Sequence, residues 1–230
     1  MVNRNLKHGK GNIAIFDTFK TRRNNFTGEA RRQRGLIAHL AVEQSPELRT
    51  RTSIAHAVAK KHHILWQNIY SGIFRDLDEV LIPSGIVKVG GRLPLRRGPK
   101  ALQLEGVPFY ELTEAGLLVA ASIEELGSDR FKLLESYIAS IPVRDQNEKI
   151  MYTGILLLIK LTPSFVFKII NEYIYAYSMG LIDHITPIDI ENLRSVISEQ
   201  IAIERQLIEA FDGLQSDQKS LVRDFFKVIG

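Results

Sequence analysis

A segment rich in glycine and proline, residues 90–108, interrupts an otherwise helical pattern and constrains the fold more than any other feature of the chain. It holds seven glycines and prolines, which forbid a long regular element there. The flanking tetrapeptides, Ile-Val-Lys-Val at 86–89 and Phe-Tyr-Glu-Leu at 109–112, are rich in β-branched or aromatic residues and predict two short strands. The sequence therefore predicts a hairpin with a long connecting loop inside a mainly α-helical protein.

Three helical segments are expected before the hairpin. The first covers about 29–44, with Thr27 as its N-cap. The second covers about 53–61, with Thr52 as its expected N-cap. The third covers about 64–77, because apolar residues recur there every three or four positions and predict a buried stripe of Trp66, Ile69, Ile73 and Leu77.

The chain returns to helical patterns after the hairpin. Thr113 is the expected N-cap of a helix over about 114–126. From Gly127 onward the apolar spacing predicts five more helices, over about 129–140, 147–161, 164–179, 187–211 and 216–228. We expect these five helices to form an α-helical bundle.

Charge is divided unevenly along the chain. Residues 1–100 contain 19 Lys and Arg against 7 Asp and Glu, a balance of +12, whereas residues 101–230 contain 11 against 19, a balance of −8. A basic half followed by an acidic half indicates that the first half meets a polyanion. The alternative is that the charge only drifts along a solvated surface. Residues 1–28 are expected to form a basic N-terminal arm whose Arg22 and Arg23 would be sequence-neutral anchors.

The order of three helices, strand, glycine-proline loop and strand resembles the winged helix-turn-helix superfamily of prokaryotic DNA-binding regulators. The residues that carry the resemblance are Ser-Ile-Ala-His-Ala-Val-Ala at 53–59, Trp-Gln-Asn-Ile-Tyr-Ser-Gly-Ile-Phe at 66–74, Ser-Gly-Ile-Val at 84–87 and Phe-Tyr-Glu-Leu-Thr-Glu-Ala-Gly at 109–116. The last stretch is similar to the Tyr-x-Leu-Thr-x-x-Gly exit from the hairpin in those regulators. The resemblance covers about 29–126 and implies a winged-helix domain there, followed by a helical C-terminal domain over 127–230 for dimerisation or effector sensing.

The resemblance implies a recognition helix over about 64–77 that enters the major groove of DNA. Gln67 and Asn68 could each form two hydrogen bonds with adenine, Arg75 could reach guanine or phosphate, and Ser71 suits a phosphate or a close backbone approach. The alternatives are that Gln67 and Asn68 are ordinary surface residues and that Arg75 pairs with Asp78 or Glu79.

Further cations are expected to contact phosphates, which supply most of the affinity for DNA. The basic wing over about 90–108 contributes Arg92, Arg96, Arg97 and Lys100, unless this loop is merely solvated. The helix before the recognition helix is flanked by Arg49, Arg51, Lys60 and Lys61, where a helix-turn-helix crosses the DNA backbone.

Several other classes of site find no support in the sequence. The chain has no cysteine, which removes disulfide scaffolds, cysteine nucleophiles and cysteine metal sites. The histidines lack the spacing of a zinc site, and His62-His63 is expected to be part of a turn. No phosphate-binding loop, dinucleotide fingerprint or nucleophile elbow is present. We therefore expect a protein that is not an enzyme and needs no metal or other cofactor.

Two features of the C-terminal half suggest partners. An aromatic-rich stretch could line a ligand pocket or belong to the core, and consists of Phe165, Phe167, Tyr173, Tyr175 and Tyr177. An amphipathic stripe from Ile190 to Ile208 fits a helix packed on a partner from this chain or another. We expect a homodimer formed through the C-terminal helices.

The sequence thus predicts a mainly α protein, a winged helix-turn-helix followed by an α-helical bundle, that acts as a sequence-specific transcriptional regulator on double-stranded DNA. A second hypothesis is a structural or assembly protein of chromatin, replication or partition that binds DNA without sequence preference. A third is an enzyme in which the winged helix is an accessory. No run of 18 residues lacks a charge, so no membrane span is expected, and the predicted location is the cytoplasm, in association with the nucleoid.

Overall fold

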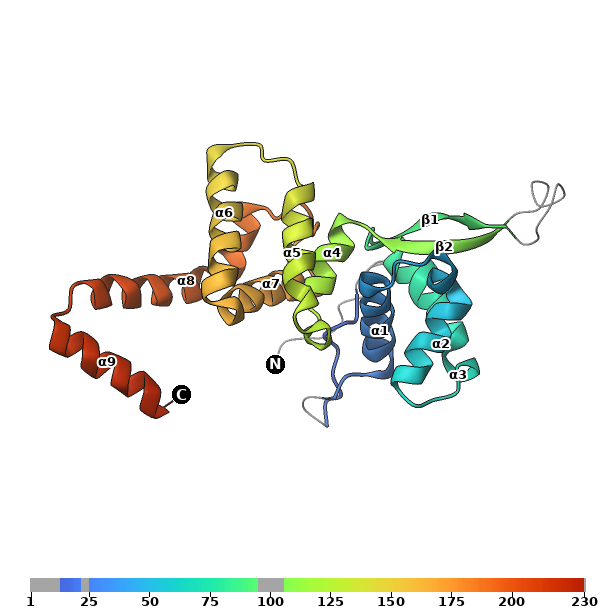
Figure 1. Cartoon of the computed structure of the whole chain (residues 1–230), viewed down its shortest axis with the longest axis horizontal. Helices are drawn as coiled ribbons and strands as arrows, with labels where there is room; N and C mark the ends of the chain where they lie inside the picture. Colours follow the sequence, from blue (N-terminus) through green and yellow to red (C-terminus); the bar gives the residue numbers. More distant parts are fainter. Residues whose placement is uncertain (1–12, 22–24, 95–105, 230) are drawn as a thin grey trace.

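The computed structural model describes residues 13–21, 25–94 and 106–229 of the 230-residue chain. The described residues form a mainly helical protein with one two-stranded antiparallel hairpin in its N-terminal half (Figure 1). The first half contains α1 (Gly28–Val42), α2 (Arg51–Lys61), α3 (Gln67–Arg75), β1 (Val87–Leu93), β2 (Val107–Leu112) and α4 (Glu114–Ala121). The second half contains α5 (Asp129–Ser140), α6 (Gln146–Leu161), α7 (Pro163–Ser178), α8 (Ile190–Asp212) and α9 (Ser216–Ile229). Short 3-10 turns, η1 (Pro46–Arg49) and η4 (Glu124–Leu126), and the π-helical turn η2 (Asp76–Leu81) complete the connections.

The N-caps follow the expected chemistry with one correction. Thr27 caps α1 by accepting a hydrogen bond from the Ala30 amide, and Thr113 caps α4 in the same way from Gly116, as the sequence predicts. The prediction that Thr52 caps the second helix is wrong. Thr50 is the cap, because its extended backbone forms a bridge with β2 and its Oγ1 accepts from the Ser53 amide.

The third helix is shorter than predicted at its N-terminal end. Residues 62–65 form a turn rather than helix, because α2 ends at Lys61, His62 is its C-cap and His63 adopts a left-handed conformation with φ of 53°. The expected place of His62-His63 in a turn is confirmed. Ile69, Ile73 and Leu77 are buried, as the apolar stripe predicted, whereas Trp66 is only partly buried and precedes α3. The chain continues from α3 into η2.

The strands of the hairpin are longer than predicted, so the expected loop over 90–108 is too long. β1 continues through Gly90 and Gly91 to Leu93, and β2 begins at Val107, which leaves residues 94–106 as the connection. A Cβ at Gly91 would lie 2.8 Å from the Phe109 ring, so this position requires glycine within the strand. A register shift between Val89 and Gly91 marks the site of the irregularity.

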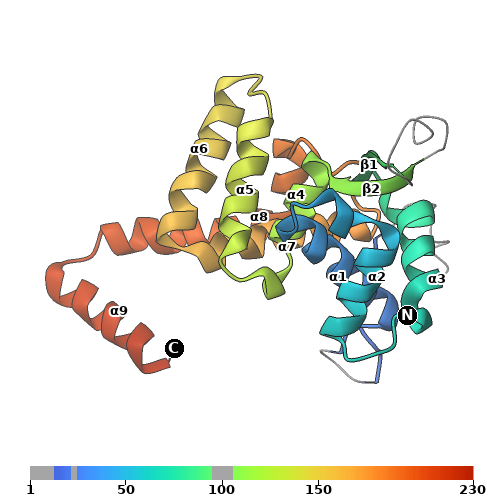
Figure 2. The ribbon, with the colours of Figure 1, turned by 45° about the vertical axis from the view of Figure 1, so that its right-hand side comes forward.

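The five helices predicted for the second half are present, but they do not all form a bundle. α5, α6, α7 and the first half of α8 pack together, and their buried residues continue the core of the first half across residue 127. The rest of α8 and all of α9 extend away from this body (Figures 1 and 2). α8 fully buries only Ile197, and no residue of α9 whose side chain is described is buried.

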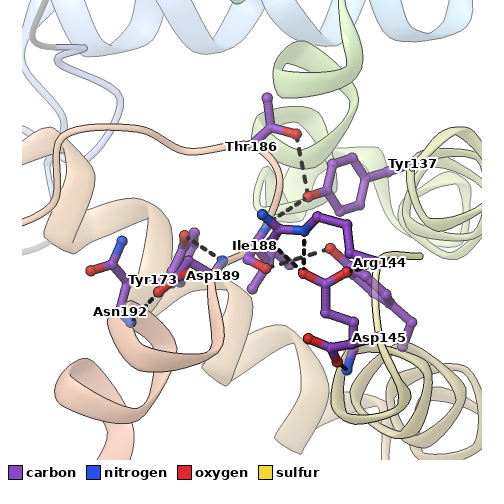
Figure 3. Close-up of polar contacts among 10 residues, drawn as sticks. Tyr137, Arg144, Asp145, Tyr173, Thr186, Ile188, Asp189 and Asn192 are labelled. Atoms are coloured by element: carbon purple, nitrogen blue, oxygen red, sulfur yellow. Dashed lines mark hydrogen bonds and ion pairs between the residues drawn. The ribbon is translucent and has the colours of Figure 1, made fainter. Parts of the chain in front are cut away.

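A cluster of tyrosine hydroxyls fixes the residues that lead into α8 (Figure 3). The Tyr137 hydroxyl accepts hydrogen bonds from the Ile188 amide at 3.0 Å and from the Thr186 hydroxyl at 3.4 Å. The Tyr173 hydroxyl accepts from the Asp189 amide at 3.2 Å, and Asp189 caps α8. Burial raises the pKa of both tyrosines, so the two phenols remain protonated across the physiological range.

Candidate nucleic-acid interface

The polar residues predicted on the recognition helix form one exposed face of α3. Gln67, Asn68, Ser71 and Arg75 are all exposed, and at 100° per residue they fall within about a third of the helix circumference. The alternative that Arg75 pairs with Asp78 or Glu79 is not observed: Asp78 pairs with Arg51, and no ion pair to Arg75 occurs among the described residues. The α3 face therefore presents amide, hydroxyl and guanidinium groups to solvent.

The opposite side of α3 is locked to the core. Ile69 and Ile73 are buried, and a series of aromatic contacts runs along the flank of the helix. Trp66 packs against His56 of α2 at a centroid distance of 4.5 Å and against Tyr70 at 5.4 Å, and Tyr70 contacts Phe74 at 4.7 Å. Packing of this kind holds the exposed face in one orientation.

A buried ion pair ties the end of α3 to α1. Arg32 donates two hydrogen bonds to the fully buried Asp76 carboxylate, Nε to Oδ2 at 2.8 Å and Nη2 to Oδ1 at 3.1 Å. The Arg32 side chain crosses α3 at Gly72, where a Cβ would lie 2.6 Å from Nε. Burial raises the pKa of Asp76, although the hydrogen bonds and charge of Arg32 act to lower it.

Arg51 joins α2, the end of α3 and the hairpin rather than facing outward. Its guanidinium stacks on the Phe74 ring at 4.3 Å, its Nε donates to the Tyr110 hydroxyl at 2.5 Å and its Nη2 pairs with Asp78. Burial raises the pKa of Tyr110 against the opposing effect of the Arg51 charge. The residue predicted to contact phosphate thus has its donors directed at groups of its own chain.

Arg49 has a similar internal role. Its Nε donates to the Glu43 carbonyl oxygen at 2.6 Å, and its Nη1 lies 3.6 Å from a Glu111 carboxylate oxygen on β2. Only 11% of its side chain is exposed. Together with the bridge between Thr50 and Phe109, this contact pins the hairpin to the start of α2.

The remaining predicted cations differ in how far the structure describes them. Lys60 and Lys61 are exposed at the C-terminal end of α2. Arg92 is exposed on β1 and donates from Nη1 to the Gly106 carbonyl oxygen at 3.0 Å. Arg96, Arg97 and Lys100 lie outside the described residues. The hairpin that carries Arg92 and the helix that carries Arg75 lie at the same end of the molecule (Figures 1 and 2).

The aromatic stretch of the second half is divided between core and surface hollows. Tyr173 and Phe167 are buried in the core, and Phe167 and Tyr175 each line one of two adjoining surface hollows. The two have volumes of about 330 and 510 Å³ and share Glu124, Asn171 and Glu172. The expectation that this stretch belongs to the core is confirmed for Phe167 and Tyr173, and the ligand pocket stays a prediction.

The described residues bring together no group of three or more His, Asp or Glu side chains that could hold a metal ion. Within the same part of the chain no helix is both long and apolar enough to cross a membrane. No protein-family model, curated protein or solved structure matches the chain.

Proposed function

We propose that the chain is a sequence-specific DNA-binding regulator that reads the major groove with α3 and holds the DNA backbone with its hairpin, in the manner of a winged helix. The observation that carries this proposal is the exposed face of Gln67, Asn68, Ser71 and Arg75 on a helix fixed from behind. A reading helix needs polar side chains in one orientation, because hydrogen bonds to base edges are directional. The balance of +12 over residues 1–100 adds the charge that a polyanion requires.

The residues take different roles in this proposal. Gln67 and Asn68 read adenine, and Arg75 reaches guanine or a neighbouring phosphate. Phosphate contacts fall to Lys60, Lys61, Arg92 and the loop cations Arg96, Arg97 and Lys100. We assign no phosphate to Arg49 or Arg51, because their guanidinium groups already bind Glu111, Asp78 and Tyr110.

We expect the change of Gln67 and Asn68 to alanine to relax sequence preference without weakening the general affinity for DNA. Each good bidentate contact is worth about 1–3 kcal/mol of discrimination, so preference should fall at one or two base pairs. The slope of log K against log salt should hardly change, because no phosphate contact is removed. Competition binding with single-base variants of a preferred site measures both quantities.

The matched control is Gln44→Ala, which removes an exposed amide that follows α1 and lies outside α3 and outside the C-terminal helices. It should leave the preference and the slope unaltered. A Gln67→Ala/Asn68→Ala protein with unchanged base preference would move the reading surface away from α3.

The competing function is DNA binding without sequence choice, as in a chromatin or partition component. The charge of the first half favours that function as much as the proposed one, since counterion release is independent of sequence. Retardation of a preferred fragment against excess competitor DNA separates the two. Equal competition by all sequences would support the structural role.

A further inference from the structure

α6 carries an apolar stripe that nothing in the described chain covers. Ile150, Leu157 and Leu161 are exposed by 61, 59 and 67%, and Gly154 lies between them. Spacings of 4, 3 and 4 place the four residues on one line along the helix. Because nothing lies within 4 Å of a Cβ built at Gly154, another helix could approach α6 closely at its centre.

The second uncovered surface belongs to the arm, defined as residues 199–229 of α8 and α9 together with their connection. The upstream part of the predicted stripe packs on the body, where Ile197 is 6% exposed. From there onward the apolar side chains face solvent: Ile201, Ile203, Leu207, Ile208, Leu221, Phe225, Phe226 and Val228.

Hydrogen bonds hold the start of α8 and the elbow of the arm. The Tyr137 and Tyr173 hydroxyls accept from the Ile188 and Asp189 amides, which lead into α8 about ten residues before the arm begins (Figure 3). At its elbow, the Phe211 ring receives Lys219 and Arg223 at 5.8 and 5.6 Å, and the Lys219 Nζ donates to the Asp212 carbonyl oxygen at 3.1 Å. The apolar side chains of the arm are therefore exposed because these contacts direct the end of α8 and all of α9 away from the body.

The α6 stripe and the arm lie in the same half of the molecule, which is opposite to the end formed by α3 and the hairpin (Figures 1 and 2). We propose that a second copy of this chain covers both surfaces, with the arm of each copy packed against α6 and the arm of its partner. Two-fold symmetry makes such a dimer a closed assembly, because each copy uses the same two surfaces to bind its partner.

The charges of the two surfaces are complementary. Residues 199–212 carry Glu199, Glu204, Glu209 and Asp212 against Arg205, a balance of −3. α6 presents Lys149 and Lys160 to solvent, while its one acidic residue, Glu148, is buried and bound to Arg144. Residues 213–229 add Lys219, Arg223 and Lys227 against Asp217 and Asp224, so the whole arm keeps a balance of −2. An acidic arm beside a basic α6 favours a second copy, whereas an anionic lipid surface would repel residues 199–212.

The number of exposed apolar side chains also favours a dimer. Eight large apolar side chains of the arm and four of α6 are exposed in each copy. Monomers seldom leave contiguous apolar patches above roughly 300–600 Å² uncovered. A standard interface buries about 800 Å² on each partner, and its centre is filled by aromatic and aliphatic side chains of this kind.

Light scattering in the absence of DNA tests the proposal on the full chain. The wild type, whose chain mass is 26.1 kDa, should give twice that mass at micromolar concentration. Phe225→Glu in the arm and Leu157→Glu on α6 should each raise the dissociation constant at least 100-fold and give the monomer mass. The control is Leu65→Glu, a residue 68% exposed in the turn before α3, which should leave the mass doubled.

Cysteine cross-linking tests the exchange itself and does not depend on a disruptive variant. The chain has no cysteine, so Leu157→Cys and Phe225→Cys each create a single thiol. When the two proteins are mixed and oxidised, with one carrying a mass tag, the exchange predicts a mixed disulfide-linked product. Leu65→Cys in place of either partner should give none.

Four results would overturn the proposal: a wild-type monomer at 100 µM, a mass that rises without limit, a Leu157→Glu protein that remains dimeric, or no mixed product. Binding of monomers to anionic vesicles would likewise assign the arm to a membrane surface. None of these outcomes bears on DNA binding, which is measured separately.

Discussion

Replacement of the four predicted wing cations, Arg92, Arg96, Arg97 and Lys100, by alanine should weaken binding to all DNA sequences alike. Each phosphate contact contributes about 0.9 to the slope of log K against log salt, so the slope should fall by roughly 2 to 4. At 0.15 M salt this corresponds to a loss of affinity of roughly 10²- to 10³-fold. Fluorescence anisotropy of a labelled duplex over a range of salt concentrations measures both quantities.

The control changes three exposed cations of the second half that lie outside α6 and the arm, Lys132, Lys168 and Arg194, to alanine. This protein loses one formal charge fewer than the wing variant and keeps the proposed dimer surfaces intact. Its salt slope should stay near that of the wild type. A wing variant with an unchanged slope would show that the loop does not meet the DNA backbone.

Replacement of Asp76 by alanine should cause the largest loss of stability among the substitutions considered. The change leaves the Arg32 guanidinium, whose side chain is 17% exposed, without its two hydrogen bonds. Loss of one partner of a buried ion pair typically lowers the free energy of unfolding by about 3–5 kcal/mol. Urea unfolding followed by circular dichroism measures the difference.

Two further variants establish the cause of that loss. Glu191→Ala removes an exposed carboxylate that pairs with Arg194 and should cost less than about 1 kcal/mol. The double change Arg32→Met/Asp76→Leu should recover much of the loss, because no unpaired charge remains in the core. An Asp76→Ala protein as stable as the wild type would mean that the pair does not hold α3.

The stability linked to Asp76 changes with pH in the direction opposite to that of a carboxylate whose pKa is lowered by an exposed ion pair. Its pKa is raised in the folded state by burial, so the folded chain binds the proton more tightly than the unfolded chain does. The stability linked to this group is therefore greatest below its unfolded pKa and falls as pH rises through the folded pKa. The pair positions α3 at a cost in desolvation, which is the reason that the double apolar variant should be tolerated.

Local signals account for most of what the sequence predicts correctly. The periodic apolar positions locate the helices, and Thr27 and Thr113 act as caps through contacts only three residues away. Local sequence alone predicted the wrong cap for α2, because the choice of Thr50 over Thr52 depends on a bridge to Phe109 on β2. Gly90 and Gly91 led to the prediction of a loop. The sequence does not show that the Phe109 ring packs across β1 at these positions, which is why glycine occurs within the strand.

The candidate site also has features that local sequence predicts and features that depend on distant contacts. Exposure of Gln67, Asn68, Ser71 and Arg75 follows from helical spacing, because these residues lie off the apolar stripe. The internal contacts of Arg49 and Arg51 connect them with Glu111 and Tyr110, about 60 residues further along the chain. Likewise, periodicity identifies the apolar face of the arm but not whether the same chain covers it.

The most direct test of the proposed function is selection of bound fragments from a pool of random duplex DNA by the full-length protein. The account predicts enrichment of a defined motif, with two half-sites if the chain acts as a dimer. The same selection with the Gln67→Ala/Asn68→Ala protein should return the motif with one or two positions degenerate in each half-site. A pool that is bound without enrichment, or not bound at all in low salt, would contradict the claim that α3 reads DNA sequence.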